Sequence, residues 1–157
     1  MQKTAPRFTK TDLSLSTPEL ARSAEGWLLD GEIRQHSKRT LEARRSIIDK
    51  LIWYLRHKEY PVCGTLELRQ FLAYVGKGHE QAGGRWGNAQ MTRPVRPRTV
   101  HTYHGHLRTF FRWLIQEGIL EASPMEAIAA PSPHSMTIKG RIQIQLRRGK
   151  PTPSRKP

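Results

Sequence analysis

The chain has 157 residues, which fits one ordinary domain with tails and leaves little room for a second full domain. Lysine and arginine total 27 against 13 acidic residues, giving a formal net charge of +14 at pH 7 and a pI near 10.8. This balance favours a polyanionic partner, because each phosphate that the protein neutralises releases counterions. Nucleic acid is the first partner class to consider, and an anionic membrane surface the second.

The sequence disfavours membrane-spanning or secreted proteins, and it disfavours proteins held together by disulfides or by cysteine-rich zinc sites. No apolar run approaches the ~20 residues that span a bilayer, and the N-terminal residues lack the apolar stretch of a signal peptide. Cys63 is the only cysteine, so an internal disulfide and a cysteine-rich zinc site are both excluded. We expect a small buried or half-buried thiol at Cys63.

Helices are predicted along most of the chain. Residues 1–16 are polar without a sustained period, and we expect them to be disordered. Thr17 is the predicted N-cap of a first helix, because Pro18 and Glu19 suit a first turn. Apolar residues then recur at the spacing of one buried face until Asp30 and Gly31, which are expected to end the helix.

The second and third predicted helices follow the same logic. Ser37 can cap a long helix over residues 38–58, which the Tyr60 and Pro61 pair interrupts. Thr65 can cap a short third helix that ends at Gly76. Residues 76–97 contain five glycines and two prolines without apolar periodicity, so we expect a mobile loop there.

The fourth helix shows the clearest periodicity in the chain. It is predicted to begin at Pro97, in the first-turn position, and to end at Gly118 as a C-cap. Ser123 and Pro124 should open a brief fifth helix with Met125 and Ile128 as its inward residues, and the packed domain is expected to end at Pro131.

An ordered series of motifs carries a family resemblance. The pieces are SKRTL at 37–41, LELRQFL at 66–72, RTVHTYHGHLRTFFRWLIQEG at 98–118 and ASPMEAIAAP at 122–131. Over residues 17–131 this series resembles the N-terminal SAM-like, or core-binding, domain of tyrosine recombinases, the phage integrases. The resemblance implies an all-α bundle of four to five helices that grips one face of duplex DNA, with its second and fourth helices across the major groove.

The charges agree with that expectation. No acidic residue occurs between Glu80 and Glu117, whereas six arginines do. A merely solvated helix face usually mixes both signs, so a one-signed stretch suits a phosphate backbone. On the fourth helix, His101, Gly105 and Arg108 fall opposite the apolar stripe.

The candidate DNA-binding residues lie at the starts of the two long helices, along their polar faces and in the preceding loop. They are Lys38, Arg39, Thr40, Arg44, Arg45, Arg93, Arg96, Arg98, Thr99, His101, Thr102, Arg108 and Arg112. Arg44 and Arg45 are equally well interpreted as ordinary surface residues, with Arg45 in an ion pair with Asp49. The pattern does not distinguish base contacts from phosphate contacts.

Other chemistries receive less support. His101, His104 and His106 could suggest a metal, but helical geometry puts the last two on different faces and no carboxylate or cysteine completes a site. We therefore expect no metal, no cofactor and no small-molecule substrate. Trp86, beside Arg85 in the glycine-rich loop, either stacks on a ligand or covers the core.

We expect no catalysis by this chain alone. The resemblance implies that the cleaving arginines, lysine, histidines and tyrosine belong to a second domain, and the 26 residues after Pro131 contain no tyrosine. Residues 132–157 instead form a basic, proline-rich tail, with Ile138, Ile142 and Ile144 hinting at a short strand.

Two origins for such a chain remain open: a truncated or frameshifted integrase, or a stand-alone DNA-binding protein. Its expected partners are duplex DNA and other recombinase protomers on that DNA, and no membrane. The expected location is the cytoplasm, at the nucleoid. The alternative class is a basic RNA-binding or ribosome-associated structural protein, for which charge alone would suffice.

Overall fold

Four α-helices account for most of the described chain. The computed structural model describes residues 13–79 and 83–132. Its elements are β1 (Leu15–Ser16), α1 (Thr17–Ile33), α2 (Lys38–His57), β2 (Val62–Cys63), α3 (Thr65–Gly76), the 3-10 turn η2 (Arg85–Gly87) and α4 (Pro97–Gln116). The expected all-α class is confirmed, and the two short strands form one antiparallel ladder in which Leu15 pairs with Cys63.

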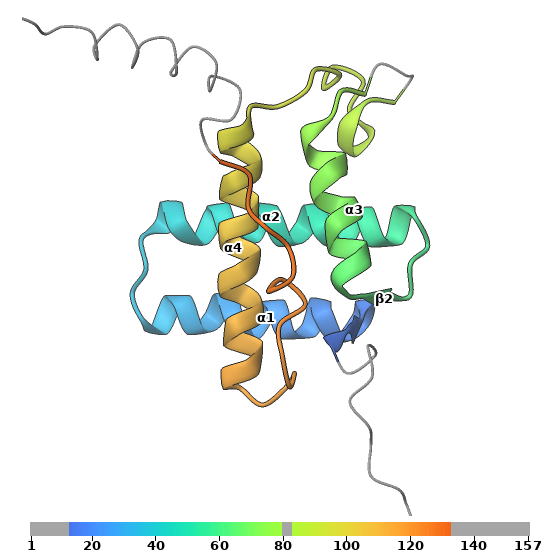
Figure 1. Ribbon diagram of the computed structural model, residues 1–157. Coiled ribbons are helices and arrows are strands. Elements are labelled where there is room, and N and C mark those ends of the chain that lie inside the picture. The colour runs from blue at the N-terminus through green and yellow to red at the C-terminus, as the bar shows by residue number, and fades with distance from the viewer. Residues whose placement is uncertain (1–12, 80–82, 133–157) are drawn as a thin grey trace, which may run out of the picture.

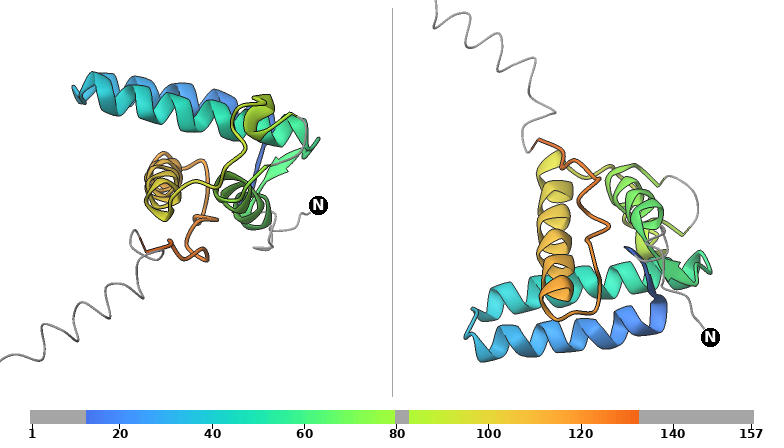
Figure 2. Two further views of the ribbon diagram at one scale, coloured as in Figure 1. Left: turned by 90° about the horizontal axis from the view of Figure 1, so that it is seen from above. Right: turned by 60° about the horizontal axis from the view of Figure 1, so that its bottom comes forward.

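The helices form two layers that cross. α1 and α2 make an antiparallel hairpin, and α3 and α4 lie in a second layer across it (Figure 1). Viewed from above, the loop end of the hairpin extends beyond α4, and the segment 117–132 lies on the side of α3 and α4 away from the hairpin (Figure 2). We call this end of the hairpin the overhang; it consists of the loop 34–37 with the end of α1 and the start of α2 that the loop joins.

The core lies between the layers and is largely aromatic. Phe110 and Phe111 of α4 are fully buried, and the Phe110 ring lies 5.0 Å from the ring of Trp27 of α1. Phe71 of α3 and Leu51 of α2 are also fully buried. Burial of this much apolar surface is the main force that holds the crossed layers together.

The N-cap of the first helix lies one residue earlier than predicted, at Ser16 rather than Thr17. The N-cap is Ser16, whose hydroxyl accepts the Glu19 N–H at 3.2 Å, while the Glu19 carboxylate accepts the Ser16 N–H at 3.3 Å. Thr17 is instead the first helical residue, and its buried hydroxyl donates to the carbonyl of Tyr60. Leu15 and Ser16 therefore belong to the ordered domain, although the sequence placed them with the disordered segment.

Gly31 packs against the second helix and does not end the first. α1 continues to Ile33, and a Cβ atom at Gly31 would lie only 2.7 Å from Cδ2 of Leu41 and 3.1 Å from Nη1 of Arg44. The glycine is thus explained by close approach of the two helices. The α2 boundaries agree with the prediction within one residue, and Ser37 caps that helix through the Thr40 N–H.

The expected fifth helix is a turn. Residues 124–127 form turns and no regular helix, because so short a segment cannot recover the cost of helix nucleation. Its predicted inward residue Met125 is nevertheless buried. The segment is held by side chains of two helices: Thr65 donates to the carbonyl of Pro124 at 2.9 Å, and His104 Nε2 lies 2.7 Å from the carbonyl oxygen of Ile128.

Several other expectations can be compared with the structure. Gly118 follows α4 with a φ of 77°, as expected for a left-handed C-terminal residue. Cys63 is buried, and burial raises the pKa of its thiol. None of the described helices has the length and apolarity needed to cross a bilayer. The expected disorder of residues 1–12 and the expected strand and basic tail beyond residue 132 lie outside the described residues.

Met125 tests whether the segment 117–132 belongs to the core. Its side chain is 1% exposed, so Met125→Ala should lower the free energy of unfolding by about 2 to 5 kcal/mol through the cavity that it leaves. Urea unfolding followed by circular dichroism measures this change. Met91, which is 37% exposed, is the matched control, and Met91→Ala should change stability by less than about 0.5 kcal/mol. Equal stability of Met125→Ala and the parent protein would show that the segment does not pack here.

Candidate nucleic-acid interface

The outer side of α4 is exposed along its whole length and carries positive charge. Its exposed residues are Arg98, Thr102, Gly105, Arg108, Thr109, Arg112 and Gln116. The opposite side is fixed against the core by Leu107, Phe110 and Leu114, all fully buried. Because the buried stripe sets the rotation of the helix, the arginines must face outward.

The middle of this outer face carries small side chains. A Cβ atom at Gly105 would meet nothing within 4 Å, so the glycine serves no close contact within the described protein. The neighbouring threonines turn their hydroxyls back to the helix: Thr102 donates to the carbonyl of Arg98 and Thr109 to that of Gly105. Small side chains therefore separate Arg98 from Arg108, and a partner can approach the helix backbone closely between them.

One flank of the same helix is covered by the segment 117–132. His101 Nδ1 lies 2.9 Å from the carbonyl oxygen of Pro131, and His104 is buried against Ile128. Arg112 lies 3.9 Å from the Glu126 carboxylate, in an exposed pair of little energetic weight. The histidines thus hold the segment in place, and among the described residues no cluster of three metal-ligating side chains is present.

The loop before α4 presents exposed arginines at the start of that helix. Arg93, Arg96 and Arg98 are exposed, and Arg96 is the N-cap residue, although its side chain makes no capping hydrogen bond. Thr99, a further predicted contact, is exposed beside them. The structure therefore brings four predicted residues together at one end of α4, where a helix N-terminus favours anions.

Arg85 differs from the other arginines of the acid-free stretch. It is 3% exposed, and its guanidinium donates to the carbonyls of Lys77 and Arg93. These bonds fold the loop back onto the end of α3. Arg85 is therefore a structural residue, which the sequence pattern alone did not distinguish from its exposed neighbours.

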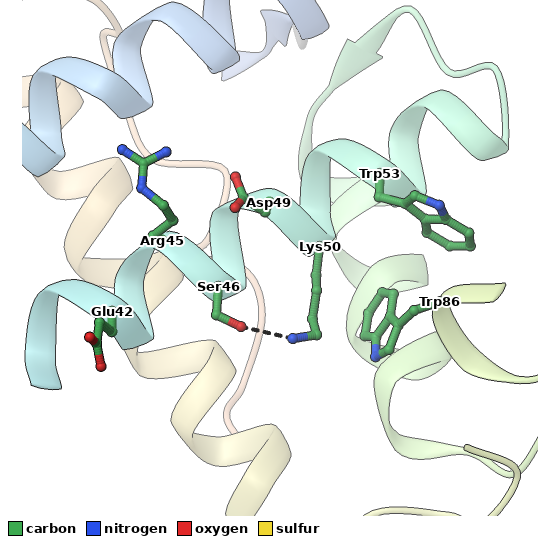
Figure 3. Close-up of a pocket in the computed structure, with 7 residues that line it drawn as sticks. All are labelled: Glu42, Arg45, Ser46, Asp49, Lys50, Trp53 and Trp86. Carbon is green, nitrogen blue, oxygen red and sulfur yellow. Dashed lines mark hydrogen bonds between the residues drawn. The ribbon is translucent and has the colours of Figure 1, made fainter. Parts of the chain in front are cut away.

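Trp86 covers the core. Its backbone N–H donates to the Tyr74 hydroxyl, and its ring lies 5.8 Å from the ring of Trp53 and 5.8 Å from that of Phe71. Together with Lys50 and other residues of α2, the two tryptophans line a groove of about 580 Å³ (Figure 3). The groove also contains two carboxylates, Glu42 and Asp49, so its charge is mixed and it offers no one-signed surface.

The predicted residues of α2 divide into three groups. Lys38 and Arg39 are exposed at the overhang, with Thr40 partly buried behind them. Arg45 forms a two-pronged ion pair with Glu25 of α1, at 3.0 and 3.1 Å, in place of the expected pair with Asp49. That hydrogen-bonded pairing raises the pKa of Arg45 and lowers the pKa of Glu25.

Arg44 forms the third group, and it points inward. It is only 8% exposed, and its guanidinium lies over the ring of Trp27 at 4.4 Å from the ring centre. Both helix starts that the sequence singled out are thus exposed, but they lie apart: the start of α2 is at the overhang, and the start of α4 is at the far end of the crossing helix (Figure 1).

Gly105 offers a test of the open face. Gly105→Ala should raise the free energy of unfolding by about 0.5 to 1 kcal/mol, because alanine loses less backbone entropy in a helix and meets no neighbour here. Urea unfolding measures the change. Gly26→Ala is the matched control in α1: its methyl would lie 3.2 Å from the Trp113 ring, so its gain should be smaller or negative. Destabilisation by Gly105→Ala would contradict an open face.

The burial of His106 predicts that the folded protein loses stability at acid pH. Burial, and then the charge of Arg44, lower the pKa of His106 from its usual 6.5. The unfolded chain therefore takes up a proton more readily than the folded one, so stability should fall as the pH drops below about 6.5. Urea unfolding between pH 8 and pH 5 measures this slope. His106→Gln should flatten it, and an unchanged slope in His106→Gln would assign the effect elsewhere.

Comparisons with known proteins give one structural similarity. No protein-family model matches the sequence, and no curated protein is detectably similar. Among solved structures, the chain is similar to the integrase from mycobacterium phage Brujita, with 20% sequence identity and a TM-score of 0.49. The similarity covers 90% of this chain and 36% of that integrase.

Proposed function

We propose that this chain binds duplex DNA through the outer face of α4, as a core-binding domain of the tyrosine recombinase type. The observation that carries the proposal is the exposed basic face: Arg98, Arg108 and Arg112 point outward, and no acidic residue occurs in α4. The Glu126 carboxylate beside Arg112 belongs to the segment 117–132 and forms only a weak exposed pair. Such a face releases counterions when it meets phosphates and suffers no repulsion from carboxylates of its own helix.

The dimensions of α4 suit a groove of DNA. A helix of 20 residues is about 30 Å long, and the major groove is about 12 Å wide, enough to admit one helix. Arg98 and Arg112 lie 14 residues apart, which separates them by about 21 Å along the axis. In this arrangement Gly105 and its threonine neighbours approach the base edges, while the arginines at either end reach the flanking phosphates.

A second contact region is proposed at the overhang. Lys38 and Arg39 are exposed at the first turn of α2, where backbone N–H groups and the helix dipole also favour phosphate. The nearby Glu42 lies 4.0 Å from Lys38 in an exposed pair, which is too weak to hold the lysine away from a partner. Two basic regions along one molecule would fix its register on the duplex.

We further propose that Tyr54 and Tyr103 do not act as nucleophiles for DNA strand cleavage. A tyrosine nucleophile needs a lowered barrier to deprotonation, but burial raises the pKa of Tyr54 to about 12 and also raises the pKa of Tyr103. Incubation with supercoiled DNA should yield neither nicked product nor covalent protein–DNA adducts. The chain would then hold DNA in a recombination complex while other residues cut it.

Charge-matched variants test the proposed face. The triple variant Arg98→Ala, Arg108→Ala, Arg112→Ala should weaken duplex DNA binding at least tenfold, and its salt slope should flatten by about 0.9 for each phosphate that the variant no longer neutralises. Fluorescence anisotropy at several salt concentrations measures both quantities. The control triple Arg22→Ala, Arg56→Ala, Lys58→Ala removes the same charge from exposed positions elsewhere and should bind nearly as the parent does.

Two outcomes would overturn the proposed function. Equally weakened binding in both triple variants would mean that net charge alone drives binding and that the α4 face is not the site. Tighter binding of structured RNA than of duplex DNA, at matched length and salt, would favour the ribosome-associated class instead. A DNA preference that depends on the α4 arginines supports the proposal.

A further inference from the structure

A pocket lies in the corner where α4 crosses the overhang of the α1–α2 hairpin. Its volume is about 310 Å³, and its walls come from α1, from the start of α2 with the loop before it, and from the second half of α4. The lining residues with nitrogen atoms that could bind an anion are Arg34, His36, Arg44, Arg112 and Trp113. The size is at the lower end of the range for ligand sites in proteins.

Buried polar atoms without a partner gather at this pocket. Within residues 13–79 and 83–132, four buried side-chain nitrogen or oxygen atoms lack a hydrogen-bond partner, and three belong to residues of this pocket. These three are His36 Nδ1, Arg44 Nε and Trp113 Nε1. Because nearly all buried polar groups in folded proteins are bonded, three such atoms at one pocket call for a ligand that binds there. Arg44 Nε and Trp113 Nε1 can only donate, so that ligand must supply acceptors.

Arg44 has no carboxylate partner of its own, although Asp30 also lines the pocket. Arg44 is buried, and none of its nitrogens comes within salt-bridge distance of a carboxylate in the described protein. The Asp30 carboxylate, the nearest acid at the pocket, bonds Nε of Arg34 at 2.8 Å. Burial lowers the pKa of Arg44, and the attraction of Asp30 offsets only part of that effect. A buried cation of this kind is stabilised by an anion from outside.

We propose that this pocket binds a phosphate group, with Arg44 and the Trp113 indole N–H as inner donors and Arg34 and Arg112 at the rim. Guanidinium and indole groups only donate hydrogen bonds, so they suit a ligand that only accepts. Phosphate presents several acceptor oxygens and matches the arginine fork. The packing of Arg44 Nη1 and His36 Nδ1 against Gly31 keeps both nitrogens on the same side of α1.

This site adjoins the proposed DNA-binding face, because Arg112 lines both. The phosphate could come from the DNA backbone beside α4 or from a small phosphorylated molecule. Both sources share the chemistry that the pocket recognises, and the experiment below separates them.

The first measurement uses inorganic phosphate and the full chain. At constant ionic strength, phosphate should raise the thermal unfolding midpoint progressively, whereas chloride should not. Arg44→Met should weaken phosphate binding about tenfold or more, because it removes a charged donor of similar length. Without phosphate, Arg44→Met should unfold at the same temperature as the parent or higher, since it also removes the buried unpaired charge.

Two further variants keep the test decisive. Trp113→Phe deletes the indole N–H while keeping an aromatic ring, and it should weaken phosphate binding even if Arg44→Met folds poorly. Arg22→Met changes an exposed arginine of α1 outside the pocket and should keep the full phosphate response. Absence of any response beyond that of chloride in the parent protein overturns the proposal, as does an equally weakened response in Arg22→Met.

Duplex DNA then identifies the source of the phosphate. Weaker DNA binding by both Arg44→Met and Trp113→Phe means that the pocket seats a backbone phosphate. Unchanged DNA binding, together with the disappearance of the response to inorganic phosphate, assigns the pocket to a small phosphorylated molecule. The phosphate response is measured without DNA, so a failure of the proposed DNA binding leaves this result intact and the two failures are distinguishable.

Discussion

The crossing of α4 over the α1–α2 hairpin is the contact on which the other features depend. Trp27 and Phe110 meet there with ring centres 5.0 Å apart, and the apolar stripe of α4 is fully buried around them. This packing turns the arginines of α4 outward and leaves the end of the hairpin projecting past the helix. The corner between them is the phosphate pocket, so one packing arrangement creates both proposed sites.

The helices were predictable because their signals are local. Ser37, Pro97 and Gly118 take the positions that the sequence assigned to them, since capping and first-turn preferences depend on a few neighbouring residues. The short ladder between Leu15 and Cys63 was not predictable, because strands of two residues carry no period. The segment that begins at Ser123 was assigned the wrong conformation but the correct inward residue, Met125.

The arginines show where sequence reasoning about the site stops. Arg44 and Arg45 are adjacent, yet Arg44 is buried on Trp27 while Arg45 pairs with Glu25 on the neighbouring helix. Both partners are distant in sequence, so only the packing of α1 on α2 separates the two roles. The structural role of Arg85 likewise depends on how the chain folds, because its two acceptor carbonyls come from the end of α3 and from the loop. Exposure of Arg98, Arg108 and Arg112 followed from helical periodicity alone.

The segment 117–132 reverses direction after α4 and returns along it, so that Pro131 lies beside His101 near the beginning of the same helix. The polypeptide therefore leaves the described domain next to the face proposed to meet DNA. His101 and His104 fix this segment to α4, so the helix that carries the proposed DNA-binding face also sets the path by which the polypeptide leaves the described domain.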